Sequence, residues 1–322
     1  MCGIYMIEKY RYGYNSVLGS ESQQVVLMHF LRVRICKALK ILKFPRCRSE
    51  NPLKKCICDN VFFCSMMCIM NSKAVLQYYK YEGETLAELL LRVRKEQDIA
   101  DTVPLTYAGR LDPMAEGVVL VLTGEECKKK DEYLGMDKTY EYEVLFGVET
   151  DTFDILGMPK IKKTFFENDF LGDLINANTI QTVLKNFMGK IKQTYPPYSS
   201  KTVDGVPLFQ YAREGNLGAI ELPTNEVEIY YHEFLGLRTV SRDELLSQVE
   251  ERIKKVKGDF RQDEILKAWF ATRTTLPETL FIASFRISCS SGTYIRRIAS
   301  DMGTILGASS LAWKIKRTKI GK

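Results

Sequence analysis

The residue with the clearest chemical potential is Asp112, an acid within the glycine-rich stretch Tyr107–Gly124. Gly109 and Gly117 allow the backbone to turn tightly or to approach another group closely. The apolar run Val118–Leu122 predicts a buried strand, and a reactive carboxylate fits the loop just before it. Asp112 is therefore a candidate nucleophile. These residues alone leave one alternative open, because Asp followed by Pro is also typical of a helix start.

Few residues are available for other nucleophilic or metal chemistry. The chain has only His29 and His232, so histidine metal clusters and Ser-His-Asp triads are almost excluded. Seven of the nine cysteines lie within the first 68 residues. Their spacing from Cys56 to Cys68 lacks the paired Cys-x2-Cys arrangement that zinc sites favour. We therefore predict no metal, with zinc in this segment as the weaker alternative.

The pattern G-x-L-D-P-x-A-x-G at residues 109–117 resembles the signature loop of the TruB family of tRNA pseudouridine synthases. The resemblance implies that Asp112 attacks the target nucleotide. It also implies that Tyr107, Gly109, Arg110 and Leu111 contact RNA. Tyr107 stands where family members usually have histidine, a departure that concerns how the base is drawn out of the RNA and not the nucleophile.

Further motifs resemble the family in the same order along the chain. Lys138-x-Tyr140 implies a tyrosine that stacks on the target base, since every base offers a π-surface. The stretch 289–303, like C-S-x-G-T-Y-I-R, implies that Arg296 pairs with Asp112, because a guanidinium holds a carboxylate ionised and oriented. The acidic loop 150–157 is interpreted as structural. The other residues expected at RNA or at the pocket wall are Tyr198, Ser199, Lys201, Tyr211, Arg213, Tyr294 and Ile315, with Lys316 and Arg317 near phosphate.

Periodicity and capping signals predict the elements that position these residues. Alternating apolar residues predict strands at 138–147 and 281–288, and helical spacing predicts helices elsewhere. One predicted helix runs from Thr85 to about Asp98 and begins with a T-x-x-E capping box, and a polar one is predicted at 127–134. A third is capped by Asn178 and ended by Gly189. A helical insertion is predicted at about 241–279, with a Ser241–Glu244 capping box and with Trp269 and Phe270 as packing anchors.

Composition divides the chain into a basic extension, residues 1–69, and a body, residues 70–322, that resembles the family's catalytic domain. The extension has 11 Lys and Arg against four Asp and Glu, and a start site placed too early would also explain it. A basic amphipathic helix is expected at 24–44. Residues 286–322 hold eight basic residues and one acid, so we expect this tail to face phosphate. The predicted fold is α+β, a mixed, largely antiparallel sheet flanked by helices, as in pseudouridine synthases.

The resemblance spans roughly residues 74–321 and implies a cofactor-free isomerase that acts on the T-loop uridine at tRNA position 55. The expected partner is the T-arm stem-loop. We expect a cytoplasmic protein, because the body is poor in cysteine and no apolar run reaches the ~18 residues of a membrane span. A monomer is also expected. Three alternatives stay open: a guide-RNA-dependent synthase, a tRNA-binding protein without turnover, and a glycoside hydrolase that pairs Asp112 with Glu116.

Overall fold

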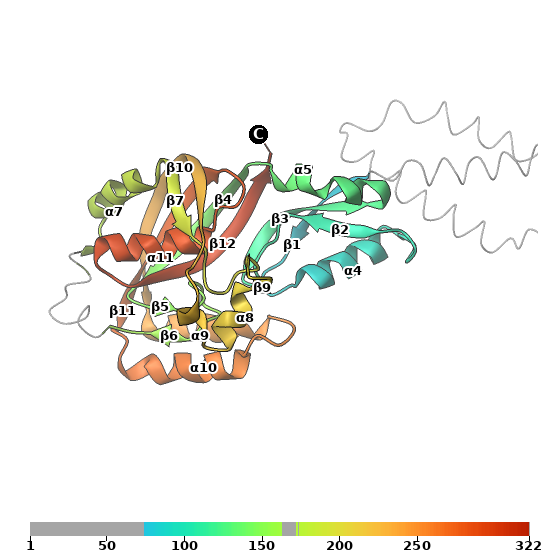
Figure 1. Ribbon diagram of the computed structural model, residues 1–322. Helices are drawn as coiled ribbons and strands as arrows, with labels where there is room; N and C mark the ends of the chain where they lie inside the picture. Colours follow the sequence, from blue (N-terminus) through green and yellow to red (C-terminus); the bar gives the residue numbers. More distant parts are fainter. Residues whose placement is uncertain (1–73, 163–171, 173, 322) are drawn as a thin grey trace, which may run out of the picture. The chain divides into compact units, whose positions relative to one another are not determined.

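A mixed sheet of eight strands organises the computed structural model, which describes residues 74–162, 172 and 174–321 (Figure 1). Seven strands follow the order β1-β3-β12-β4-β11-β10-β7, and β2 pairs with β3. The strands are β1 (Val75–Lys80), β2 (Leu105–Ala108), β3 (Ala115–Thr123), β4 (Lys138–Phe146), β7 (Gly189–Thr194), β10 (Thr224–Ser241), β11 (Thr279–Cys289) and β12 (Ser310–Ile320). Two short hairpins lie outside the sheet, β5 (Glu149–Thr150) with β6 (Pro159–Lys160), and β8 (Thr202–Val203) with β9 (Val206–Pro207).

Almost all described strand pairs of this sheet are antiparallel. The exception is β12, which runs parallel to β3 with Ile315 opposite Ala115 and Arg317 opposite Gly117. On its other edge β12 pairs antiparallel with β4. The predicted α+β class with a mixed, largely antiparallel sheet is therefore confirmed.

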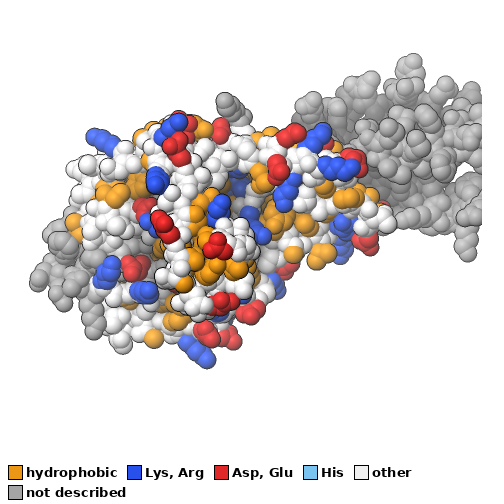
Figure 2. Space-filling view, in the orientation of Figure 1, with side chains coloured by type: hydrophobic (Ala, Val, Ile, Leu, Met, Phe, Trp, Pro, Cys, Tyr) orange, Lys and Arg blue, Asp and Glu red, His pale blue; other side chains and the backbone are white. Residues whose placement is uncertain are grey.

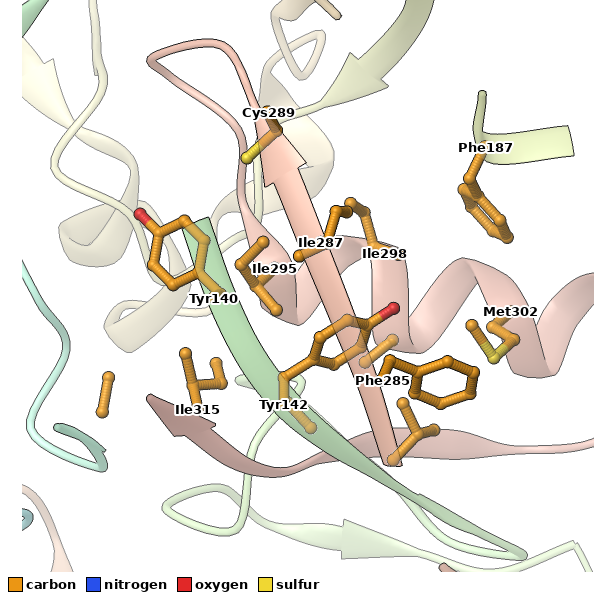
Figure 3. Packing of buried hydrophobic residues seen from close by; sticks show 14 of the residues in the cluster. Tyr140, Tyr142, Phe187, Phe285, Ile287, Cys289, Ile295, Ile298, Met302 and Ile315 are labelled. Atoms are coloured by element: carbon orange, nitrogen blue, oxygen red, sulfur yellow. The ribbon is translucent and has the colours of Figure 1, made fainter. Parts of the chain in front are cut away.

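Helices cover both faces of the sheet, to different extents. One face of β4 presents Tyr140, Tyr142 and Val144 to a core that also contains buried residues of α4, α7 and α11. Figure 3 shows Tyr140 and Tyr142 on the same strand with their hydroxyls pointing away from each other. The other face packs on α9 and α10 at one end, where Leu145 joins a second core. The helices are α4 (Leu86–Glu96), α5 (Lys130–Leu134), α7 (Ala177–Leu184), α8 (Leu208–Arg213), α9 (Arg242–Lys254), α10 (Gln262–Ala271) and α11 (Ile295–Leu306).

Several predicted boundaries are confirmed and others shift. Thr85 caps α4 in a capping box with Glu88, as expected. The cap of α7 is Asn176 and not Asn178, because the Asn176 side chain accepts the main-chain N–H groups of the first turn. The polar segment predicted at 127–134 is a 3₁₀ helix, Gly124–Lys129, followed by the single turn α5.

The region predicted as a helical insertion contains α9 and α10, between β10 and β11. Ser241 caps α9 by accepting from the Glu244 N–H, but the return bond of a capping box is missing, since Glu244 bonds Gln248 instead. Trp269 is fully buried, as predicted, whereas Phe270 is 39% exposed, which contradicts its expected packing role. The two residues are adjacent on α10 and therefore point about 100° apart.

The N-terminal predictions lie outside the described residues, including the amphipathic helix at 24–44 and the cysteine cluster. Among the residues that are described, no helix is both long and apolar enough to cross a membrane. The same part of the chain has no group of three or more His, Cys, Asp or Glu side chains arranged to hold a metal ion.

Candidate active site

The loop that carries Asp112 joins β2 to β3. No helix follows Pro113: the Ala115 N–H donates to the Asp112 carbonyl at 3.0 Å, and β3 begins at Ala115. The interpretation of Asp112 as a helix cap is therefore wrong, and its carboxylate is free for another role. The apolar side chains Leu111 and Met114 are buried on either side of it.

Arg317 holds the backbone of this loop. Its guanidinium donates to the carbonyls of Val118 at 2.7 Å and Gly109 at 2.9 Å, and the side chain is 1% exposed. Gly117 allows the close approach, because a Cβ there would lie 2.2 Å from the Arg317 carbonyl oxygen. Arg317 is expected near phosphate from the sequence, and in the structure its guanidinium is engaged with main-chain acceptors in the interior. Arg317 therefore holds the backbone of the loop that carries Asp112.

A buried lysine supports the same loop from β1. The Nζ of Lys80 donates to the carbonyls of Ala115 at 2.6 Å and Pro113 at 3.2 Å. Burial lowers the pKa of Lys80 to about 8, although the Asp112 charge opposes that shift. The loop is thus fixed by two cations, Lys80 and Arg317, that come from opposite ends of the body sequence.

Arg296, in the first turn of α11, contacts the candidate nucleophile directly. Its Nε donates to Asp112 Oδ2 at 2.8 Å, and its side chain is 4% exposed. The remaining donors reach the carbonyls of Thr152 at 2.5 Å and Tyr198 at 3.3 Å, and Asp154 Oδ2 lies 3.7 Å from Nε. The predicted pairing of Asp112 with Arg296 is present in the structure.

The charges of this cluster stabilise one another. Burial acts against the charged form of Arg296, but Asp112 and Asp154 outweigh it and raise the pKa of the guanidinium. Burial raises the pKa of Asp154, and Arg296 opposes that shift. A permanently charged guanidinium is therefore fixed beside a carboxylate that is a third exposed.

A cavity of about 330 Å³ opens over the Asp112 carboxylate. Tyr140, Ile295 and Ile315 form part of its wall. Figure 3 shows these three side chains near one another within the buried cluster. Burial raises the pKa of Tyr140, so its phenol is neutral at physiological pH. The volume is near the lower end of the ~300–1,000 Å³ that ligand sites usually enclose. The predicted site residues on its wall are Gly109, Arg110, Leu111, Asp112, Tyr140, Tyr198, Ser199, Tyr294, Arg296, Ile315 and Arg317.

A second, larger cavity of about 580 Å³ adjoins the same carboxylate. Tyr107 and Arg213 line this second cavity together with Asp112, although neither of them lines the first. Figure 2 shows this face of the molecule hollowed near its middle, with hydrophobic and basic side chains around the hollow. Three expected RNA-binding residues line neither cavity: Lys201 lies over the Tyr195 ring, Tyr211 donates to the Val203 carbonyl, and Lys316 is half-buried on β12.

The family model for the N-terminal domain of TruB family pseudouridylate synthases matches residues 98–260, half of the 322-residue chain. This chain belongs to the TruB family.

Its relatives within the TruB family include three bacterial proteins named tRNA pseudouridine synthase B. The one from Lactococcus lactis is 29% identical over 248 residues, which cover 77% of this chain and 62% of that protein. The one from Flavobacterium johnsoniae is 32% identical and covers 67% and 72%, and the one from Bordetella avium is 31% identical and covers 77% and 80%. A solved Cbf5-Nop10-Gar1 complex matches with a TM-score of 0.45 at 18% identity, over 77% of this chain and 48% of that one.

In this TruB-family chain the contribution of the acidic loop 150–157 to the site is visible only in the structure. Thr152 accepts from Arg296 through its carbonyl, and the buried Asp154 lies beside the same guanidinium. The motif is interpreted as structural from the sequence, and nothing in it links its acids to Arg296. Phe260 and Arg261, which line the second cavity, carry no motif that could have identified them.

Proposed function

We propose that this protein is a tRNA pseudouridine synthase that isomerises the T-loop uridine at position 55, with Asp112 as nucleophile. The observation that supports this most directly is the Asp112–Arg296 pair, 2.8 Å apart, at a cavity walled by Tyr140 and Ile315. Membership of the TruB family supplies the reaction class, and the names of the relatives supply tRNA as the substrate.

The reaction matches the groups that the cavity offers. Converting uridine to pseudouridine breaks a glycosidic C–N bond and forms a C–C bond, with no net redox change or hydrolysis. A nucleophile and a shielded pocket suffice for it. Arg296 occupies Oδ2 of Asp112, and no described residue donates to Oδ1, which leaves that oxygen available to attack. Tyr140 offers an aromatic face to the base and a neutral hydroxyl for proton transfer.

The target uridine must leave its stack to reach Asp112. The first cavity has the size for one small ligand, and the second provides room for the neighbouring nucleotides next to the same carboxylate. Arg110 and Arg213 line the second cavity and are exposed, so phosphates that enter with those nucleotides would meet positive charge.

The hydrolase alternative requires Glu116 to act together with Asp112. Glu116 points to Lys314, at 3.2 Å, and lines neither cavity that contains Asp112. A glycoside hydrolase needs both carboxyl groups to flank one bond. The arrangement therefore favours the synthase over the hydrolase.

The test is the variant Asp112→Asn on an isolated T-arm stem-loop, with pseudouridine measured by mass spectrometry under single-turnover conditions and saturating enzyme. An amide preserves the shape but is a very poor nucleophile, so we expect the rate to fall at least a hundredfold, about 2.7 kcal/mol. RNA affinity should stay within about tenfold, because phosphate contacts elsewhere supply most of it. The matched control is Asp101→Asn, at a side chain that is 98% exposed.

Retention of more than about a tenth of the rate, less than ~1.4 kcal/mol, would show that Asp112 is not the nucleophile. Activity that requires an added guide RNA would replace the proposed substrate with the guide-dependent alternative. Tight tRNA binding by a wild-type protein that never forms pseudouridine would identify a binding protein.

A further inference from the structure

The helical segment between β10 and β11 is anchored beside the nucleophile loop. Arg252 of α9 is buried and donates to both oxygens of Glu82 at 2.7 to 3.1 Å, and to the Trp313 carbonyl at 2.8 Å. Glu82 directly precedes Gly83, whose N–H donates to the Pro113 carbonyl at 2.9 Å. The first anchor is therefore linked to the Asp112 loop by one main-chain hydrogen bond, from the neighbour of Glu82 to the neighbour of Asp112.

A second anchor holds the loop that supports Arg296. Trp269 of α10 is fully buried, and its indole Nε1 donates to the Ile155 carbonyl at 3.1 Å. Ile155 belongs to the same loop as Thr152 and Asp154, which contact the catalytic guanidinium. The α10 helix thus bonds the backbone of the loop that supports Arg296, and α9 bonds Glu82 and the β12 backbone beside the Asp112 loop.

Arg261, between these two anchors, reaches the wall of the site itself. Its Nη2 donates to Asp151 Oδ2 at 3.2 Å, and its guanidinium lies 5.0 Å from the centre of the Tyr198 ring. The backbone at Arg261 has φ +61°, a left-handed conformation that residues other than glycine seldom adopt. The chain therefore takes an unfavourable conformation at the residue that makes these two contacts.

The two partners of Arg261 lead directly to Arg296. Asp151 precedes Thr152, whose carbonyl accepts from Arg296 Nη1 at 2.5 Å, and the Tyr198 carbonyl accepts from Nη2 at 3.3 Å. The Arg261 guanidinium thus contacts both segments whose carbonyls orient the Arg296 guanidinium.

We propose that the α9–α10 segment is part of the active site and that Arg261 is its positioning residue. By holding Asp151 and Tyr198, Arg261 keeps the two carbonyls in place that aim the Arg296 guanidinium at Asp112. This rests on the proposed function, because the orientation of Arg296 matters only if Asp112 reacts. The competing role is a phosphate contact, since the Arg261 side chain is 29% exposed and lines the second cavity.

The test compares Arg261→Ala with Arg273→Ala in the full chain. Arg273 is the matched control, because it lies in the same segment, is 58% exposed and pairs only with Asp243 among the described residues. For Arg261→Ala we expect the single-turnover rate at saturating enzyme to fall roughly tenfold to a hundredfold, the loss that a ~1 Å misplacement of a reacting group produces. Stem-loop affinity should change less than about threefold, with no change in its salt dependence. Arg261→Lys should restore only part of the rate, because an ammonium keeps the charge but not the planar stacking on Tyr198.

The outcomes separate the two roles. A wild-type rate in Arg261→Ala overturns the proposal, as does weakened binding with a salt slope reduced by about one unit and an unchanged saturated rate, which marks a phosphate contact. If Arg261→Ala unfolds, Arg261→Lys and Tyr198→Leu take its place, and both must lower the saturated rate. If wild-type protein makes no pseudouridine in any RNA, the proposed function fails instead. The hydrogen exchange of the Arg296 Nε–H, measured by NMR, then still tests the positioning contact: it should speed up in Arg261→Ala and not in Arg273→Ala.

Discussion

Replacing Arg296 by lysine keeps the positive charge and removes the planar fork. In the structure this side chain donates to Asp112, Thr152 and Tyr198 from three different nitrogens. A lysine ammonium concentrates its donors at a single atom and cannot reach three acceptors held at these separations. We therefore expect Arg296→Lys to keep one contact, with Asp112 or with a carbonyl, and to lose the others.

The magnitude follows from the acceptors left without a donor. A buried acceptor that loses its partner costs about 1–3 kcal/mol, so one or two orphaned carbonyls predict a loss of about 1–6 kcal/mol in the free energy of unfolding. The reaction should lose at least a hundredfold in rate, about 2.7 kcal/mol, because Asp112 is no longer held in one orientation. Arg296→Met should be more severe, since it leaves the buried Asp154 without a positive partner.

The assay is single-turnover pseudouridine formation with urea unfolding measured on the same samples. Arg297→Lys serves as the control, because Arg297 lies next along α11, is 27% exposed and pairs with Asp301 at 2.7 Å without contacting Asp112. A rate for Arg296→Lys within about tenfold of wild type would refute the reasoning, since it would mean that charge alone, without the fork, orients the nucleophile.

Three further predictions follow from the geometry. In a urea titration, Gly117→Ala should lower the free energy of unfolding by about 3 kcal/mol or more, because its Cβ would lie 2.2 Å from the Arg317 carbonyl oxygen. The control Gly124→Ala has open space around the new Cβ and should lose only about 1 kcal/mol. Burial lowers the pKa of His232 to about 4, so the unfolded chain binds a proton at this histidine at higher pH than the folded chain does. The free energy of unfolding should therefore fall by about 3 kcal/mol as the pH drops from about 6.5 to 4. This contribution to the pH dependence should disappear in His232→Gln, and an unchanged pH dependence would contradict a neutral imidazole in the folded protein. Tyr140→Phe should bind the stem-loop within about threefold and lose roughly a hundredfold in single-turnover rate, and a wild-type rate would remove the hydroxyl from the chemistry.

The parts of the site that the sequence predicted are those that a continuous motif carries. The pairing of Asp112 with Arg296 could be predicted because each residue lies in its own family-like stretch. The strand that carries Tyr140 could be predicted because alternation of apolar residues is a local signal. In both cases the deciding information lies within about ten neighbouring residues.

The parts that could not be predicted depend on contacts between distant residues. Arg317 is expected near phosphate because residues 315–321 resemble a family motif, but its guanidinium donates to the carbonyl of Gly109, 208 residues earlier. Arg261 shows no sequence signal, since its role arises from where α9 and α10 pack. Helix caps fall between these cases: Asn176 and Asn178 are equally suitable residue types, and only the backbone geometry selects Asn176.

The place of β12 in the sheet has a consequence for how the protein is made. Among the described strands, β12 alone bonds both to the group β1, β2 and β3 and to the group that begins with β4. Asp112 belongs to the first group and Tyr140 to the second, so the two halves of the site have no common sheet until residues 310–320 enter between them. During synthesis the growing chain must therefore carry two unpaired strand edges past the ribosome exit, where they can pair with other chains. The strand β12, which joins the two halves of the candidate site, therefore also covers both exposed strand edges, and we expect binding by chaperones to decrease once it has been inserted.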